Sequence, residues 1–346
     1  MLSGRHRRPA ANNAKAFHRG GRALKGMTKS IGILILLLAL TLGVAAAPEA
    51  VVPGGDVIGL ELWSEGVCVV EFSAKAPEKA GLRTGDLICA VDGVPIATAA
   101  ELTRAVEASA GAVLCLTVSR DGAEKTVRLA PTQTAEGWRL GVYVRDRITG
   151  VGTVTYYDPS DNSYGALGHG VNQGKTLLPL RSGTVASAAV TRVQRGRSGA
   201  AGTLQGAAVA GGASGSITRN TARGIFGTMD RTAGGALMDV ADAAEVRTGP
   251  ATIRSTVAGA QVREYAVEIT ALHPDDPDGR NMSIQVTDPA LLTATGGIVQ
   301  GMSGSPIIQD GKLVGAVTHV LIDDPAAGYG IFIENMLEAA GAAGAA

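Results

Sequence analysis

The fold of this chain is decided by residues Gly296–Val320, which read GGIVQGMSGSPIIQDGKLVGAVTHV. Two runs rich in β-branched residues, 306–309 and 312–320, flank the pair Asp310-Gly311. Aspartate followed by glycine suits the positive-φ positions of a two-residue hairpin turn. The stretch therefore predicts a β-hairpin whose two strands are joined by this pair.

A serine-containing loop, GMSGSP at residues 301–306, comes directly before the hairpin. Its glycines allow the backbone to bend and leave N–H groups accessible, so a nucleophile and an oxyanion hole can share one turn. The elbow of α/β-hydrolases is not present, because Ser305 stands in place of its second glycine and no helix follows. The loop resembles the nucleophile loop of chymotrypsin-like serine proteases; an ordinary glycine-serine loop is the alternative.

Composition and periodicity predict a mostly β protein. The 346 residues include 48 glycines, and only 3% are aromatic, so Val, Ile, Leu and Ala must fill the cores. Short strands are predicted at 139–145, 152–157, 184–193, 215–219, 252–257, 261–271 and 282–287, and a helix at 334–340. Regular short strands separated by turn residues indicate a barrel or a sandwich.

The charges are unevenly distributed along the chain. Residues 1–30 contain eight Lys or Arg and no acid, which leaves the remainder mildly acidic and argues against nucleic acid as a ligand. The uncharged segment 31–47 follows this basic segment and ends in Ala45-Ala46-Ala47, so it predicts a membrane anchor or a cleaved signal peptide. Both interpretations place the remaining chain outside the cytoplasm. Met27 is an alternative start to Met1.

The cysteines and histidines do not form a metal-binding pattern. Cys68, Cys89 and Cys115 lie in apolar runs, and their odd number excludes complete internal pairing. We interpret them as small buried hydrophobic residues. No zinc-ligand spacing is found, and neither a metal nor another cofactor is expected.

A PDZ domain is predicted at 56–131, after a linker at 48–55. The pattern Ala-Gly-Leu-x-x-Gly-Asp at 80–86, followed by Val91-Asp92-Gly93, resembles the α+β PDZ domains of secreted bacterial proteases. The resemblance implies capture of a peptide terminus by β-augmentation. Ile58, Gly59 and Leu60 are the predicted binding loop and edge strand, and a plain first strand is the alternative.

A histidine in a turn-rich loop is the candidate base. His169 stands between two glycines, which supply no packing wall and leave the imidazole accessible. It precedes Ser303, the order expected of a chymotrypsin-like double β-barrel. An exposed loop histidine without a chemical role is the alternative.

The motifs together resemble the SpoIVB peptidase family. They are YGALGHG at 164–170, TDP at 287–289, GGIVQGMSGSP at 296–306, GAVTHV at 315–320 and GYG at 328–330. The resemblance implies a peptidase domain at 132–346, with Ser303 as the nucleophile, His169 as the general base and Asp288 as the orienting acid. The N–H groups of Gly301 and Ser303 would form the oxyanion hole. Four other candidates for the acid remain: Asp158, Asp161, Asp239 and Asp242.

The same resemblance implies an exported, membrane-associated serine endopeptidase of sporulation signalling, located between the membranes around the forespore. Such an enzyme cleaves itself and a membrane-bound regulator to start sigma-factor processing, while its PDZ domain controls self-cleavage and substrate recognition. Exposure and small residues predict self-cleavage within 47–56. A non-catalytic PDZ adaptor and a general exported quality-control protease are the alternatives.

Overall fold

The predicted hairpin is present in the computed structural model, which describes residues 47–230 and 234–341. Its strands are β21 (Pro306–Gln309) and β22 (Lys312–Val320), with the predicted bounds. Asp310 and Gly311 have φ angles of 51° and 79°, as a turn matching the strand twist requires. The N-terminal segments 1–30 and 31–47 lie outside the described residues except for Ala47. No helix within the described ranges is long and apolar enough to cross a membrane.

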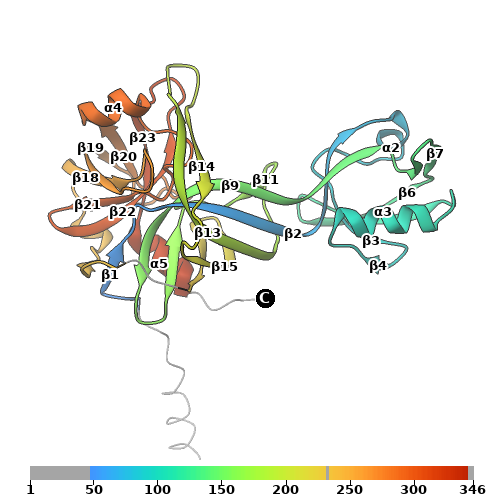
Figure 1. The fold of residues 1–346 in the computed structure, drawn as a ribbon, viewed down its shortest axis with the longest axis horizontal. Helices are drawn as coiled ribbons and strands as arrows, with labels where there is room; N and C mark the ends of the chain where they lie inside the picture. Colours follow the sequence, from blue (N-terminus) through green and yellow to red (C-terminus); the bar gives the residue numbers. More distant parts are fainter. Residues whose placement is uncertain (1–46, 231–233, 342–346) are drawn as a thin grey trace, which may run out of the picture. The chain divides into compact units, whose positions relative to one another are not determined.

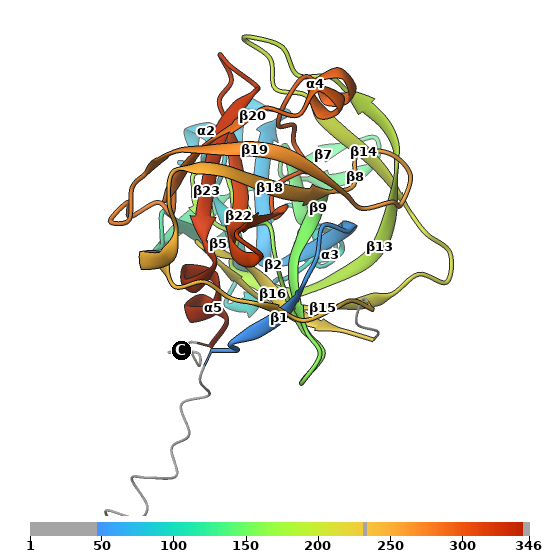
Figure 2. The same cartoon turned by 90° about the vertical axis from the view of Figure 1, so that its left-hand side faces the viewer.

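The hairpin belongs to a closed barrel near the C-terminal end of the chain (Figure 2). Around this barrel the strand order is β18-β19-β20-β23-β22-β21. The other four strands are β18 (Gly249–Ser255), β19 (Arg263–Leu272), β20 (Met282–Val286) and β23 (Ala327–Phe332). Alternating residues such as Ile253, Ile269 and Ile284 are buried inside, as expected for strands with one face towards a core.

A second ring of strands precedes this barrel, so the predicted double barrel is confirmed. Its order is β2-β9-β10-β16-β15-β13, and β13 returns to β2. These strands are β2 (Val57–Phe72), β9 (Val142–Asp158), β10 (Ser163–Ala166), β13 (Leu180–Gln194), β15 (Ser214–Thr221) and β16 (Gly224–Met229). In addition, β14 (Thr203–Ala208) pairs with β13.

The segment expected to be a linker at 48–55 is largely a strand. β1 (Ala50–Pro53) pairs with β9 and with β17 (Met238–Asp239), and Val51 and Val52 are buried. The linker prediction was therefore wrong, because the short apolar run at 50–53 adds to the first barrel.

The PDZ domain has a core of its own, with Val67 and Leu140 at its two ends in the sequence. Its strands are β3 (Leu87–Val91), β4 (Val94–Pro95), β5 (Leu114–Arg120) and β6 (Ala123–Leu129), with β7 (Thr132–Thr134) and β8 (Gly137–Arg139) following. Its helices are α2 (Lys75–Lys79) and α3 (Ala99–Ala108). Thr98 and Glu101 form a capping box that starts α3.

The PDZ domain is inserted into the first barrel. β2 and β9 each contribute one half to the barrel and one half to the PDZ domain, and both can be followed in Figure 1. The barrel halves are 57–64 and 147–158, and the PDZ halves are 67–72 and 142–146. The register shift between Trp63 and Cys68 separates them. The PDZ core thus runs from Val67 to Leu140, with Val142 and Val144 packed against it, whereas 56–131 was predicted.

Helices cover only small parts of the barrels. α5 (Ile333–Gly341) confirms the predicted C-terminal helix, and its Met336 packs with Phe226 of the first barrel and Leu313 of the second. α4 (Pro289–Thr295) was not predicted. The small remaining elements are β11 (Asn172–Gln173), β12 (Thr176–Leu177) and the 3-10 turn η1 (Ala243–Glu245).

Candidate active site

Ser303 lies in the loop between α4 and β21, where it is more accessible than its buried neighbours on both sides. Its Oγ donates a hydrogen bond of 2.8 Å to the carbonyl oxygen of Thr318 on β22. The hydroxyl is therefore held at the surface of the second barrel in this resting arrangement.

The backbone of the Ser303 loop leaves two N–H groups available. In residues 301–304 all four carbonyl groups accept a hydrogen bond. The N–H groups of Met302 and Gly304 also have partners. The N–H groups of Gly301 and Ser303 have no acceptor among the residues that the structure describes. Because buried backbone groups are almost always paired, two free donors in one turn suit an oxyanion. These are the two donors proposed from the sequence.

Two threonines of the first barrel hold this loop in place. Thr153 Oγ1 donates to the carbonyl of Gly301 at 2.8 Å, and the Thr153 N–H donates to the carbonyl of Ser303 at 3.0 Å. Thr155 Oγ1 donates to the carbonyl of Gly304 at 2.9 Å. Both threonines are fully buried on β9. The sequence did not single them out, since threonines in a strand give no sign of a partner some 150 residues away.

The loop that carries His169 packs directly against the Ser303 loop. A Cβ on Gly304 would lie 2.0 Å from the carbonyl oxygen of Thr153 and 2.5 Å from the nitrogen of Leu167, so only glycine fits there. Gly168 is in similarly close contact with Thr318. The structure therefore brings the histidine loop and the nucleophile loop together.

The ring of His169 is held in the tautomer that a general base needs. Its Nδ1 lies 2.9 Å from the carbonyl oxygen of Gly170, which can only accept a hydrogen bond. Nδ1 therefore carries the proton, and Nε2 is left to take one from a nucleophile. Burial lowers the pKa of His169, which favours the neutral, basic form at neutral pH.

Asp288 has a structural task in this arrangement. Its carboxylate accepts hydrogen bonds from the N–H groups of Ala290 and Leu291 and caps α4, and it also accepts one from Ala266. The Nδ1 of His169 faces a backbone carbonyl instead of this carboxylate. The role of Asp288 as the orienting acid thus stays a prediction.

The four alternative acids occupy turns or strand ends in other places. Asp158 bonds Ser160, Asp161 bonds the N–H of Ser163, and Asp242 begins η1. Asp239 lies on β17. None of the four has a hydrogen bond to His169 within the described part of the chain.

A second imidazole lies beside the first. The rings of His169 and His319 have centroids 5.2 Å apart and are tilted by 36°. His319 follows Thr318 on β22, so it is next to the carbonyl that holds Ser303. The packing of His319 against His169 was not foreseen from the sequence.

The predicted PDZ binding strand is wrong, because both of its edges are occupied. Ile58, Gly59 and Leu60 pair with β9 on one side and with β13 on the other. Ile58 and Leu60 are buried in the core of the first barrel. No edge is left at these residues for a peptide to join.

An edge that remains open lies on the PDZ half of β9. Residues 142–146 pair with β2 on one side only. The carboxylate of Asp146 accepts from the Ala99 N–H at the start of α3, so this strand runs beside the helix. Gly141, at φ +78°, comes directly before the strand and gives a turn that a side chain would strain.

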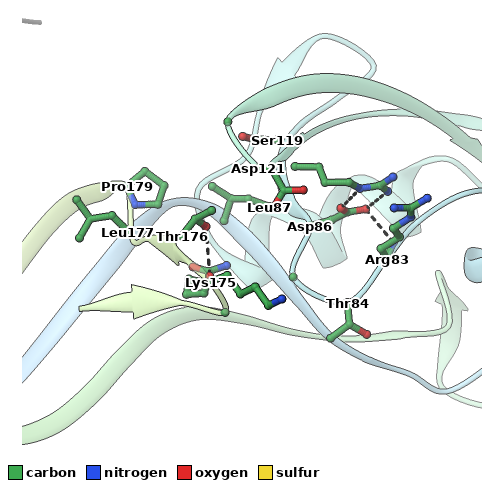
Figure 3. A pocket seen from close by; sticks show the side chains of 15 residues that line it. Arg83, Thr84, Asp86, Leu87, Ser119, Asp121, Lys175, Thr176, Leu177 and Pro179 are labelled. Carbon is green, nitrogen blue, oxygen red and sulfur yellow. Dashed lines mark hydrogen bonds and ion pairs between the residues drawn. The ribbon is translucent and has the colours of Figure 1, made fainter. Parts of the chain in front are cut away.

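Figure 3 shows a cavity of about 580 Å³ whose lining includes no residue of the Ser303 loop or the His169 loop. It is lined by the PDZ segment 83–87, the β5–β6 turn and the β11–β12 hairpin. Asp86 is buried beside it and forms two hydrogen bonds with Arg120. Since Arg120 and the Arg83 N–H satisfy this carboxylate, the interaction stabilises the PDZ fold.

The described residues contain no cluster of three or more His, Cys, Asp or Glu that could hold a metal ion. Burial raises the pKa of the Cys68 and Cys89 thiols, which makes them less reactive.

Fold and site together define a serine endopeptidase with a double β-barrel and an inserted PDZ domain. The family model for the SpoIVB peptidase S55 matches residues 136–337, and a PDZ model matches residues 43–130. The chain belongs to the SpoIVB peptidase S55 family. The PDZ match begins before the PDZ core and includes the barrel half of β2.

Other known proteins resemble parts of the chain. A candidate zinc metalloprotease of Mesorhizobium japonicum is 34% identical over 84 residues, which are 24% of this chain and 23% of that protein. The chain thus spans about a quarter of that relative's length. The Rv3671c protease of M. tuberculosis, in its active form, has a TM-score of 0.35 at 15% identity over 57% of this chain and 76% of that one. The HtrA-type protease AlgW with a decapeptide has a TM-score of 0.34 at 15% identity, over 56% and 52%.

Proposed function

We propose that this serine endopeptidase acts in sporulation signalling. It is exported, stays associated with a membrane, and cuts itself and a membrane-bound regulatory protein in the space between the forespore membranes, so that sigma-factor processing begins. Membership of the SpoIVB peptidase S55 family supports this proposal. The observation that carries the chemistry is the pair of unpaired N–H groups of Gly301 and Ser303 in a loop that packs against the loop of His169.

In the proposed reaction Ser303 Oγ leaves the Thr318 carbonyl and attacks the scissile carbonyl carbon of the substrate. Its proton passes to Nε2 of His169, and the substrate oxygen, now negative, accepts from Gly301 and Ser303. The imidazolium then gives its proton to the leaving amine. Water completes the cycle by hydrolysing the acyl-enzyme through the same groups.

Burial and strand pairing support a shorter segment for the proposed self-cleavage than 47–56. Within 47–56, residues Val51 to Gly55 are buried, and Val52 and Pro53 are paired with β9. A protease needs an accessible, extended chain. We therefore place the cut before Ala50, on the side nearer the predicted membrane segment.

We propose that the PDZ domain recognises a peptide terminus along the open edge of β9 at 142–146. This edge supplies backbone groups for an added strand, while α3 forms the opposite wall of the groove. Binding there would select the substrate or restrain self-cleavage.

Labelling by a serine-reactive fluorophosphonate, followed by peptide mapping, tests the chemistry. The full chain is expected to carry one adduct on Ser303, and the Ser303→Ala variant none, with unchanged circular dichroism. Retained self-cleavage in the variant would contradict the assignment. A folded wild-type chain without an adduct would favour the PDZ adaptor.

Two further measurements test the signalling role. Replacing Ser303 with Ala in a spore-forming host should stop development after engulfment while the protein still accumulates. Incubation with unfolded casein separates a narrow signalling protease from a quality-control enzyme: extensive digestion would favour the latter.

N-terminal sequencing of the mature chain locates the cut, and a first residue after Ala50 would contradict the proposed segment.

A further inference from the structure

His319 has an unusual environment for a residue in a well-paired barrel. Its Nδ1 is buried and has no hydrogen-bond partner, and it is the only such side-chain atom found among the described residues. Leaving a buried polar atom unpaired destabilises a fold, so an apolar ring would serve packing better at this position. The resting structure therefore shows no hydrogen bond that explains why a histidine occupies this position.

The side chain of His319 lies next to the imidazole of His169, so an interaction between the two rings is the first explanation to consider. Its ring lies 5.2 Å from that of His169, and Thr318, the preceding residue, holds Ser303 Oγ through its carbonyl. The charged groups that act on His319 from the segment between β19 and β20 are Arg280 and Asp278. Arg280 itself lies over the ring of Tyr329 on β23.

The charge state of His319 follows from these neighbours. Burial, together with His169 and Arg280, lowers the pKa of His319 to about 4, and Asp278 only partly opposes this. The ring is thus uncharged at neutral pH. A neutral imidazole carries a proton on one nitrogen and a lone pair on the other, and with the proton on Nε2 the unpaired Nδ1 of His319 offers a lone pair without adding charge to the site.

We propose that His319, with its proton on Nε2, is a positioning residue for His169: its neutral ring fixes the plane of the base, and the lone pair then left on Nδ1 stabilises the imidazolium that forms when Ser303 gives up its proton. This inference rests on the proposed serine-protease chemistry and deepens it. It gives His319 part of the electrostatic task that a carboxylate performs in a Ser-His-Asp triad. The Gly170 carbonyl, which fixes the tautomer of His169, performs another part.

The proposal is tested with His319→Phe, which keeps a ring of similar shape but removes both nitrogens. His319→Gln keeps a polar atom, and His273→Phe is the matched control on an exposed histidine bonded to Ser283. We expect the fluorophosphonate labelling rate of Ser303 to fall about tenfold or more in His319→Phe, to recover partly in His319→Gln and to stay unchanged in the control. The melting temperature of His319→Phe should equal or exceed that of the wild type.

A second readout does not depend on activity. In the full chain carrying Ser303→Ala, the pKa of His169 is measured by NMR of the ¹⁵N-labelled imidazole, with and without His319→Phe. Loss of the lone pair should lower the pKa of His169 further, since the imidazolium is no longer stabilised. A wild-type labelling rate together with an unchanged His169 titration in His319→Phe would overturn the proposal.

The two readouts separate this inference from the proposed function. If the wild-type chain is never labelled but the pKa of His169 still falls in His319→Phe, the protease chemistry fails while the coupling of the rings stands. If labelling is normal and neither variant of His319 changes it, the protease stands and His319 has only a packing role.

Discussion

The two halves of β9 differ in how much of their hydrogen bonding is already satisfied. In the barrel half, residues 154–158 of β9 pair with β10 on one edge and Tyr156 and Tyr157 pair with β1 on the other, while residues 147–153 pair with β2. Its Thr153 and Thr155 also hold the Ser303 loop. In the PDZ half, residues 142–146 have a partner on one edge only.

This difference shows how one strand supports two tasks. A nucleophile loop must be held to within fractions of an ångström, so it is anchored where backbone and side chains are saturated. A peptide-binding strand needs unused donors and acceptors, so it lies where the edge is open. Ser64, which bonds the carbonyl of Asp146, marks the place where β2 and β9 pass from one domain to the other.

The largest expected effect comes from breaking the barrel anchor. Thr153→Val removes the hydroxyl that binds the Gly301 carbonyl and leaves that oxygen unpaired, so the oxyanion donors lose their placement. Ser303 labelling should slow by about 10²-fold, the cost of misplacing a reacting group by roughly 1 Å. Thr191→Val, which removes an exposed hydroxyl on β13, is the control. Wild-type labelling in Thr153→Val would show that the anchor is dispensable.

The PDZ half is tested next by Gly141→Ala. A Cβ at this φ of +78° is strained and would lie 2.8 Å from Ala74, so the turn before the open edge must distort. Affinity for a fluorescent peptide with a free apolar C-terminus should fall about tenfold, which corresponds to about 1.4 kcal/mol. Gly122→Ala has the same kind of φ but open space around it, and it should bind normally. Equal weakening in both variants would argue against this groove.

A smaller effect is expected at Asp288 in the second barrel. Asp288→Ala removes the cap of α4 and should lower the free energy of unfolding by about 1 kcal/mol, while Asp288→Asn should retain most of it. Denaturant titration measures both. The Asp288→Asn variant also tests whether Asp288 is the acid that orients His169. A labelling rate that falls about 10⁴-fold at unchanged stability would assign this role to Asp288.

The smallest expected effect is on the pH dependence of Ser303 labelling. His169 must be neutral to accept a proton, and its pKa lies below the ordinary 6.5 because of burial. Labelling of Ser303 should therefore persist as the pH falls through 6.5 and decline only at lower pH. The same midpoint is expected in Gly141→Ala, because no PDZ group contributes to the environment of His169. A midpoint above 6.5 would contradict a buried, neutral base.

The free energy of unfolding should also decrease at low pH. An imidazole whose pKa is lowered by folding binds its proton more readily in the unfolded chain, so stability is greatest above 6.5 and decreases as the pH falls towards 4. His319 should account for part of this decrease.

Local sequence signals predicted the elements that local interactions determine. Asp310-Gly311 set the hairpin and its two strands to the residue, and the glycines around Ser303 marked a loop with free N–H groups. The sequence Asp288-Pro289 contains a cap followed by proline at the first helical position, so α4 could have been predicted as well.

Features that depend on long-range pairing were not accessible in this way. Residues 57–72 form one continuous strand, and nothing at Ser64 indicates that its two halves join different domains. The assignment of Ile58–Leu60 to the PDZ domain failed for this reason. The contact of His169 with His319 also depends on how two barrels meet, which periodicity does not encode.

The insertion of the PDZ domain constrains the order in which the protein can fold. The barrel half of β2 ends near Ser64, but its partner in β9 begins near Arg147, so the first barrel cannot close until the whole PDZ sequence has been made. A domain that folds locally and early brings these two strand ends together and shortens the loop that the barrel must close. The folded PDZ domain thus holds the two strand ends close together in the newly made chain. The Ser303 loop can bind Thr153 and Thr155 only after these strands have paired.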